Sequence, residues 1–430
     1  MTRRDLSPKV VADPISGLVD IRPVLPLVET PQFQALADKR QLGMTYLVFR
    51  SATHTRFAHC LGAYKATCEL ADRWLLAGSI DQRWRDALAV YALLHDVGHP
   101  AFSHVTEDFC EMDDDEMTMH LIDHELRDAI GACGVEFPLV YALASHQHEL
   151  YRAVHDKNVG MEKLDYLERD GFYTVYGRPP GVEYLRKYVY WVDHKVAIDE
   201  KVADHAIDAQ NFYMKMYKGV YLRKSLVIAQ RMFHKAVHRL IVCGELTPSS
   251  LPEMTDTELL ALMFMSGDPE VRRLYRLLRT RDLYREAIAV RPERFVHETR
   301  IGGKPIAAIG VSQVDMDRLI AAPELQKSNH QRLDDLEDRI ADATGIPRGG
   351  ILVVPVFNPE RFKAHDVNVL GSDGNLHSLR DRRPAHFAGM EETARSYAAL
   401  RICATPRHRA ALSEPATAQR VLDLVLTRAS

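Results

Sequence analysis

The chain has 430 residues, enough to bury a large core, and this length suggests about two or three domains. Apolar residues make up 46% and charged residues 27%, which is ordinary globular usage, and a formal net charge of −4 does not favour nucleic acid as a partner of the whole molecule. No segment reaches the roughly 18 consecutive apolar residues of a membrane span, so no membrane association is expected.

The first residues, MTRRDLSPKVVADP, carry two arginines without a following apolar stretch, so no secretory signal is predicted. The six cysteines form no CxxC pair. Reduced thiols in a cytoplasmic protein are the simplest interpretation.

Helical periodicity dominates from about residue 28 to residue 290. Trp84, Leu88, Tyr91 and His95 recur on one side of a helix, so His95 continues a buried face, and Gly98 is predicted to stop that helix. Further helices are predicted over residues 59–76, 120–132, 162–172 and 206–242.

Near residue 291 the pattern changes to short β-prone runs bounded by glycine and proline. Strands are predicted in RIGGKPIAAIGV, GGILVVPVF and YAALRICAT, a hairpin in DVNVLGSDGNLHSL, and an amphipathic helix over residues 329–344. The expected fold is mainly α. A helical domain over residues 1–290, with its core at about 45–175, precedes a smaller α+β domain over residues 291–430.

Histidines and carboxylates gather in three places: His59 in THTRFAHCLG, the pair His95 and Asp96 in LLHDVGHPAFSH, and the acidic group in MEKLDYLERD. Divalent metals that activate water for phosphate chemistry bind imidazole nitrogen and carboxylate oxygen and keep one position open. Adjacent helical residues point about 100° apart, so His95 and Asp96 reach one ion only beside a helix end. A lone histidine is more often packed or solvated than a ligand, but this combination indicates a metal site.

The stretch HDVGHPAFSH resembles the signature of the HD-domain metal-dependent phosphohydrolases. A longer stretch, from Asp13 to Tyr64, resembles the opening of the deoxynucleoside triphosphate triphosphohydrolases, which include an enzyme that joins a SAM domain to an HD domain. KLDYLERD is similar to a later helix of that family, and weaker likeness continues after residue 290. The resemblance implies an HD-domain helical bundle that hydrolyses nucleotides with a bound metal.

The resemblance also implies the metal ligands. His59, His95 and Asp96 match three of them, and the fourth, an aspartate in the family, is Glu162 here. Asp165, one turn later on the same helix, is the alternative. The cofactor is expected to be a divalent ion of unassigned identity: Mg, Mn, Fe, Co, Ni or Zn.

Other family positions surround the substrate. The implied phosphate and sugar contacts are Arg56, Gln41, Lys163, Tyr166 and Asp170. Gln41 and Asp170 would hold the 3′-hydroxyl of a deoxyribose. The implied catalytic histidines are His99, His104 and either His120 or His124, because spacing does not choose between the last two.

Several family features are missing. An arginine that contacts the triphosphate has no clear match, and only Lys215, Lys218 and Arg223 lie nearby. At the family's nucleotide-activator site, Ala37 stands where an arginine is expected, and Glu29 replaces an aspartate. These departures bear on triphosphate specificity and activation, whereas the metal ligands are unaffected.

The predicted function is metal-dependent hydrolysis of a deoxynucleoside triphosphate to a deoxynucleoside and triphosphate. One alternative is an HD phosphohydrolase or phosphodiesterase that acts on another nucleotide or on single-stranded nucleic acid. The other is a catalytically impaired nucleotide sensor. A nucleotide is the expected partner, and the resemblance implies a homo-oligomer. The cysteine usage favours a cytoplasmic location.

Overall fold

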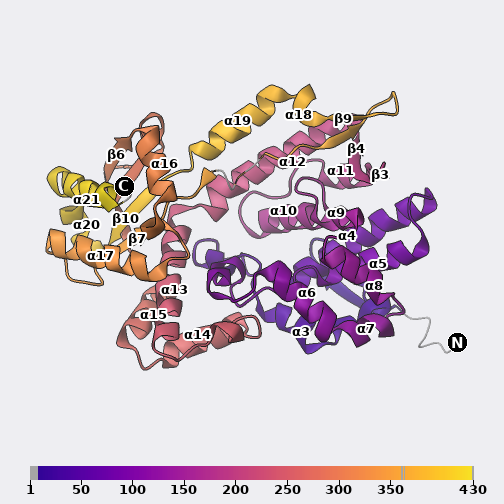
Figure 1. The fold of residues 1–430 in the computed structure, drawn as a ribbon, viewed down its shortest axis with the longest axis horizontal. Coiled ribbons are helices and arrows are strands. Elements are labelled where there is room, and N and C mark those ends of the chain that lie inside the picture. Colours follow the sequence, from indigo (N-terminus) through magenta and orange to yellow (C-terminus); the bar gives the residue numbers. More distant parts are fainter. Residues whose placement is uncertain (1–7, 360–361, 363, 429–430) are drawn as a thin grey trace. The chain divides into compact units, whose positions relative to one another are not determined.

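The computed structural model describes residues 8–359, 362 and 364–428 (Figure 1). The chain forms two compact units whose segments alternate along the sequence. The first comprises Met1–Met216, Pro248–Leu259 and His365–Phe387; the second comprises Tyr217–Thr247, Leu260–Ala364 and Ala388–Ser430. The prediction of a mainly helical fold with small sheets towards the C-terminus is confirmed.

Three helices build the centre of the first unit. α4 (Arg56–Leu76) packs against α5 (Gln82–Leu94) and α10 (Met161–Tyr173). The side chains of Thr55 and Asp81 accept backbone N–H bonds at the starts of α4 and α5, which fixes where both helices begin. The predicted helices 59–76 and 162–172 therefore correspond to α4 and α10.

Two other predicted helices are each divided in the structure. The span 120–132 contains the end of α6 (Asp114–His124) and then α7 (Arg127–Ala132). The span 206–242 is divided into α12 (Ala203–Met216) and α13 (Lys224–Val242) by a π-helical turn at Tyr217–Tyr221. Apolar periodicity continues across such breaks, so it does not reveal them.

Gly98 has a different role from the predicted one. α5 ends at Leu94, and Gly98 is not among the residues with positive φ. A Cβ atom at Gly98 would lie 2.4 Å from the backbone nitrogen of Thr118 and 2.7 Å from the carbonyl oxygen of Asp114. The prediction that Gly98 stops the helix is wrong, because this glycine instead allows α6 to approach the turn that carries His95 and Asp96.

Two sheets belong to the first unit. β1 (Val10–Asp13) and β2 (Gly17–Asp20) pair antiparallel. β3 (Val189–Val192), β4 (Lys195–Asp199), β8 (Asn368–Leu370) and β9 (Leu376–Ser378) form a four-stranded sheet in that order, with β4 and β8 parallel. The β8–β9 pair is the hairpin predicted around Ser-Asp-Gly.

The second unit contains a four-stranded sheet in the order β6-β5-β10-β7. Its strands are β5 (Arg285–Pro292), β6 (Ala307–Val311), β7 (Ile351–Val354) and β10 (Leu400–Ala404). The helices α16 (Gln313–Ala321), α17 (His330–Thr344) and α21 (Pro415–Arg428) contribute apolar side chains to the core beside this sheet.

The predicted helical region, which ends at residue 290, extends too far along the chain, because β5 begins at Arg285. β5 lies inside the sheet and is buried along almost its whole length, so its central residues, AIAV at 287–290, are apolar without alternation. α13 and α15 (Pro269–Thr280) also pack within the second unit. The unit boundaries therefore differ from the predicted boundary at residue 290.

In the described part of the chain, no helix combines the length and apolar character needed to cross a membrane. The six cysteines form no disulfide among these residues.

Candidate active site

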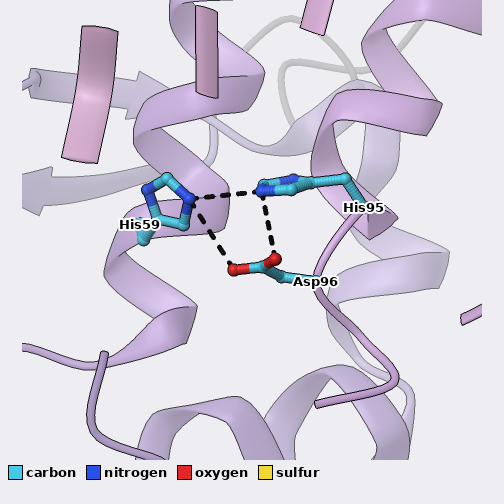
Figure 2. A group of neighbouring side chains, drawn as sticks. All are labelled: His59, His95 and Asp96. Atoms are coloured by element: carbon cyan, nitrogen blue, oxygen red, sulfur yellow. Dashed lines mark hydrogen bonds and ion pairs between the residues drawn. The ribbon is translucent and has the colours of Figure 1, made fainter. Parts of the chain in front are cut away.

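Three buried side chains meet inside the first unit (Figure 2). His59 lies on the second turn of α4, and His95 and Asp96 follow the end of α5. The Nε2 atoms of the two histidines are 3.2 Å apart. Asp96 places Oδ2 3.7 Å from Nε2 of His59 and Oδ1 3.5 Å from Nε2 of His95. The structure therefore brings together three of the four predicted metal ligands.

The proton positions of the two histidines favour a cation between them. Nδ1 of His59 faces the Asp165 carboxylate at 2.8 Å, and Nδ1 of His95 faces the carbonyl oxygen of Ala92 at 2.8 Å. Both partners only accept hydrogen bonds, so each neutral ring carries its proton on Nδ1 and a lone pair on Nε2. Burial lowers the pKa of His95 to about 4, which keeps that ring neutral.

Two lone pairs facing each other at 3.2 Å repel unless a cation binds them both. Nitrogen ligands held about 2.1 Å from one ion, at angles near 90–109°, stand about 3.0–3.4 Å apart. The spacing of the two histidines lies within that range. The residues present therefore fit a divalent metal ion.

Arg56, at the first position of α4, holds Asp96 in its charged form. Burial alone would raise the pKa of Asp96, but the Arg56 guanidinium and the nearby histidines hold it well below its usual range. Nη1 of Arg56 donates to Oδ2 of Asp96, and Nε donates to Oγ of Ser103 at 2.6 Å. Nη2 of Arg56 is buried and has no partner among the described residues. One strong donor is therefore left for a ligand.

Glu162 lies beside the cluster and is bonded to a residue that the sequence analysis did not single out. Its carboxylate lies 2.7 Å from Nδ1 of His155, the last residue of the short helix α9 (Arg152–His155). Burial would raise the pKa of Glu162, but His155 and His95 lower it to about 2. The ring centroid of His155 is 5.4 Å from that of His95.

Asp165 occupies the opposite side of His59 from His95 and Asp96. Its carboxylate lies on the Nδ1 side of the ring and also accepts from Nε of Arg169 at 3.0 Å. Arg169 is fully buried and donates to Asp13 as well, at 2.8 Å. Such carboxylates fix the ring orientation and tautomer of metal-binding histidines.

His99 and His104 extend the site towards α6. Nε2 of His99 lies 3.3 Å from Oδ1 of Asp96 and 2.9 Å from Oδ2 of Asp114. Burial and Arg56 oppose protonation of His99, yet these two carboxylates raise its pKa. The exposed ring of His104 lies edge-on to His99, with centroids 4.8 Å apart.

His120 and His124 are placed differently from the other predicted histidines. Both are exposed on α6, and their rings stack on each other with centroids 4.4 Å apart. Asp114, at the start of the same helix, is the α6 residue that contacts His99. No local pattern in the sequence predicts this long-range contact.

His54 contacts both Gln41 and Asp170, the two residues predicted to bind the sugar. Nε2 of His54 lies 2.9 Å from Oδ1 of Asp170, and the backbone N–H of Gln41 donates to the carbonyl oxygen of His54 at 3.0 Å. Oε1 of Gln41 is buried without a partner among the described residues. His54 was not predicted as a site residue.

The remaining predicted contacts lie on α10. Nζ of Lys163 sits over the Tyr213 ring, 3.3 Å from its centroid, and is 5.6 Å from that of Tyr166. Burial lowers the pKa of Lys163 to about 7. The Tyr166 ring centroid is 6.4 Å from that of His59. Of the candidates for the missing arginine, Lys218 pairs with Glu298 within the second unit.

Two family matches cover separate parts of the chain. Residues 56–170 match the HD domain, and residues 189–305 match the HD associated region. All of the predicted metal ligands and predicted catalytic histidines lie within the HD-domain match.

Curated relatives match a short segment. The chain is 44% identical over 101 residues to the deoxynucleoside triphosphate triphosphohydrolase SAMHD1 of Gallus gallus and 42% identical over 101 residues to that of Homo sapiens. It is 38% identical over 114 residues to the uncharacterized protein YwfO of Bacillus subtilis. The SAMHD1 matches cover 23% of this chain and only 16% of either relative, and the YwfO match covers 24% and 25%.

Solved structures match nearly the whole chain. A phosphohydrolase from Bacteroides thetaiotaomicron has a TM-score of 0.70 at 20% identity, over 92% of this chain and 99% of its own. A hypothetical protein from Aquifex aeolicus has a TM-score of 0.68 at 21% identity, over 96% of this chain and 100% of its own. These likenesses establish a shared fold.

Proposed function

Because this chain belongs to the HD-domain phosphohydrolases and carries an HD associated region, we propose that it hydrolyses deoxynucleoside triphosphates to deoxynucleosides and triphosphate. The observation that carries the proposal is the pair of facing Nε2 atoms of His59 and His95 beside the Asp96 carboxylate. A divalent ion bound by such ligands lowers the pKa of a bound water and neutralises charge on phosphoryl oxygens.

In this proposal, His59, His95 and Asp96 bind the ion, and Glu162 is the fourth ligand. The Glu162 carboxylate pairs with His155 in the free protein and is already ionised, so it would leave that pairing to bind the ion. Asp165 is the less suitable alternative, because its carboxylate lies on the Nδ1 side of His59 and is shared with Arg169. We assign Asp165 to the orientation of His59.

The phosphates bind to positive groups around the cluster. The unpartnered Nη2 of Arg56 is a buried donor next to Asp96, and a charge-assisted bond to a phosphate oxygen would satisfy it. Burial disfavours the protonated, charged form of Lys163 in the free protein. A phosphate bound nearby would favour that charged form again. Tyr166, on α10, has its ring near both Lys163 and His59, and we assign it to packing against the substrate.

Proton delivery falls to His99, with His104 beside it. Asp96 and Asp114 favour the protonated form of His99, so this ring holds a proton that a leaving oxygen can accept. His104 is exposed and contacts His99 edge-on, so it can exchange that proton with solvent. The exposed positions and mutual stacking of His120 and His124 support neither as the acid.

Gln41 and Asp170 are assigned to the sugar. The Gln41 Oε1 atom is buried and unpartnered, and a sugar hydroxyl would donate to it. His54 holds the Asp170 carboxylate in place and fixes the backbone of Gln41, so the two polar groups act together.

A substrate and metal panel tests this function. Purified protein is assayed with Mg²⁺, Mn²⁺, Co²⁺, Ni²⁺ and Zn²⁺ against four deoxynucleoside triphosphates, ribonucleoside triphosphates, nucleoside monophosphates, dinucleotides and single-stranded DNA. We expect a deoxynucleoside and inorganic triphosphate in equal amounts, resolved by ion chromatography. Release of deoxynucleoside monophosphate and pyrophosphate instead would contradict cleavage between the α-phosphorus and the 5′-oxygen.

The second candidate is an HD phosphohydrolase or phosphodiesterase with another nucleotide or a nucleic acid as substrate. It is favoured by the lack of a clear match to the family's triphosphate-contacting arginine; one nearby candidate, Lys218, pairs with Glu298. The same panel separates it, because turnover would then be confined to monophosphates, dinucleotides or single strands. A nucleotide sensor would show thermal stabilisation by nucleotide and no turnover with any metal. Light scattering tests the predicted homo-oligomer.

A further inference from the structure

The Lys163 ammonium rests on the face of the Tyr213 ring. Its Nζ atom is 3.3 Å from the centroid of that ring, well inside the roughly 6 Å over which a ring face attracts a cation. We propose that Tyr213 is a positioning residue, whose ring holds the Lys163 ammonium where a substrate phosphate binds. This inference deepens the proposed function and rests on it, because the phosphate contact of Lys163 belongs to that proposal.

Two packed helices bring this pair together. Lys163 is the third residue of α10 and Tyr213 lies in the last turn of α12, and the two helices contact each other within the first unit. Both residues are half-buried. A contact between a cation and a ring is stronger at such a position than on an open surface, because less water competes for the cation.

A buried polar cluster fixes α12 against the start of α10. Nε2 of Gln210, on the turn of α12 before Tyr213, donates to Oδ1 of Asn158 at 2.8 Å, and Oε1 of Gln210 lies 2.9 Å from Nε2 of His386. Asn158, just before α10, also donates to the backbone carbonyls of residues 365 and 366. Gln210 and Asn158 are both buried. The Tyr213 ring is therefore carried by a helix whose position relative to α10 is set by hydrogen bonds.

The ammonium held by Tyr213 is close to the candidate metal centre. Lys163 directly follows Glu162 in the chain. Its Nζ atom is 5.6 Å from the centroid of the Tyr166 ring, and that centroid is 6.4 Å from the centroid of His59. The Tyr213 ring therefore fixes a cation in the neighbourhood of the groups that would bind the ion and the phosphates.

An aromatic ring holds the ammonium without neutralising it. Within the part of the chain that the structure describes, Lys163 contacts two rings and forms no ion pair with a carboxylate. A carboxylate in the place of the ring would cancel the charge of Lys163 and repel a phosphate. A neutral ring face attracts the cation and leaves its charge available to an anion.

A lysine that binds a phosphate benefits from such a partner, because its side chain is flexible. The four-carbon stem loses much rotamer freedom when the ammonium is fixed in one place. A ring that holds the ammonium before the substrate arrives removes part of this entropic cost from binding. Loss of the ring should therefore weaken the binding of phosphates and leave the groups that carry out the chemistry in place.

A double-mutant cycle on the full chain tests the proposal. KM and kcat for the best substrate, and the affinity for inorganic triphosphate by calorimetry, are measured for Tyr213→Leu, Lys163→Met and the double variant. We expect Tyr213→Leu to raise KM and weaken triphosphate binding by about 3–30-fold with little change in kcat, and to have no further effect in the Lys163→Met background. Tyr213→Phe keeps the ring and should behave as the wild type.

The matched control is a second lysine–tyrosine pair in the same unit. Nζ of Lys201 is 3.8 Å from the centroid of the Tyr188 ring, and neither residue is assigned to the site. Tyr188→Leu should leave KM, kcat and triphosphate affinity unchanged. If Tyr213→Leu does not fold by circular dichroism, phenylalanine and trifluorophenylalanine are compared at position 213. Fluorination weakens the attraction of the ring face for a cation with little change of shape, so KM should be higher for the fluorinated ring.

The outcomes separate this inference from the proposed function. Wild-type KM and triphosphate affinity in Tyr213→Leu would overturn the role of Tyr213, and so would effects of Tyr213→Leu and Lys163→Met that add in the double variant. A wild type that binds triphosphate but hydrolyses no phosphate ester in the panel contradicts the proposed function, and the cycle on triphosphate affinity then decides the role of Tyr213. A wild type that neither binds triphosphate nor hydrolyses any substrate contradicts both.

Discussion

The carboxylate of Asp165 lies 2.8 Å from Nδ1 of His59, on the opposite side of that ring from His95 and Asp96. Arg169 and His59 hold the pKa of Asp165 well below its usual range, although burial alone would raise it. Asp165 is thus an ionised acceptor that fixes the proton of His59 on Nδ1 and leaves Nε2 free to bind an ion.

Replacing Asp165 is therefore expected to weaken metal binding without removing a ligand. Asp165→Asn should lower the affinity for Mn²⁺ by about 10–100-fold, because an amide can donate to Nδ1 and permit the other tautomer. Competition with a chelating dye measures the affinity. Asp128→Asn, at an exposed position on α7, is the control. Unchanged affinity in Asp165→Asn would show that the tautomer of His59 is set by something else.

Substitutions of Glu162 and His155 test whether Glu162 is the fourth metal ligand. If Glu162 binds the ion, Glu162→Ala should lower metal affinity by about 10–100-fold or more, and His155→Ala should lower it less. The reason for the smaller effect is that His155 holds the Glu162 carboxylate without being assigned as a ligand. The same dye competition measures both variants. A Glu162→Ala variant with full affinity would indicate a site of three protein ligands.

Gly62 controls how closely α10 approaches α4. A Cβ atom there would lie 2.0 Å from Oδ1 of Asp165 and 2.5 Å from Nη2 of Arg169, both of which are fully buried. Gly62→Ala should destabilise the fold by about 1–3 kcal/mol through overpacking and should also weaken metal binding.

The control for Gly62→Ala is another helical glycine. Gly131, on α7, has no atom within 4 Å of a built Cβ, so Gly131→Ala should stabilise the fold by about 0.5–1 kcal/mol. Urea unfolding of the two variants should move the midpoint in opposite directions. A stabilised Gly62→Ala variant would mean that Asp165 and Arg169 can shift without cost.

Asp334 gives the second unit a pH dependence. Burial would raise the pKa of Asp334, but His238, Lys235 and Arg231 lower it. A carboxyl with a lowered folded pKa stabilises the fold above its unfolded pKa, near 4, and loses that effect as the pH falls through the folded value. Asp334→Asn should therefore cost about 2 kcal/mol at pH 7, and the difference from wild type should shrink below about pH 4.

Chemical unfolding between pH 3 and pH 8 measures this difference. Asp335→Asn, the exposed neighbour on α17, should stay within about 0.5 kcal/mol of wild type throughout. A gap between Asp334→Asn and wild type that is constant with pH would contradict an ionised Asp334 in the fold.

The main helices and the central cluster were accessible from sequence because their signals are local. Apolar spacing places His95 on an inward face and Asp96 follows directly at a helix end, whereas His59 was assigned by its match to a ligand of the family. The strands β6 to β10 could be predicted because glycine and proline bound their short apolar runs in the sequence. In contrast, β5 has no such alternation, since it is buried on both faces inside its sheet.

The supporting residues of the site were not accessible in the same way. His155, His54 and Asp114 reach their partners across separations that depend on how α9, α10 and α6 pack. No spacing rule relates them to Glu162, Asp170 or His99. The role of Gly98 was missed for the same reason, because it depends on the approach of α6 rather than on the local backbone.

The most direct test of a metal centre built from His59, His95 and Asp96 is the double variant His95→Ala/Asp96→Ala. Metal content by mass spectrometry and turnover of the best substrate are measured on the same folded samples, with His120→Ala as the exposed histidine control. We predict that the double variant loses the ion held by this cluster and all turnover, while the control keeps both. A double variant that is free of metal and fully active would contradict the account.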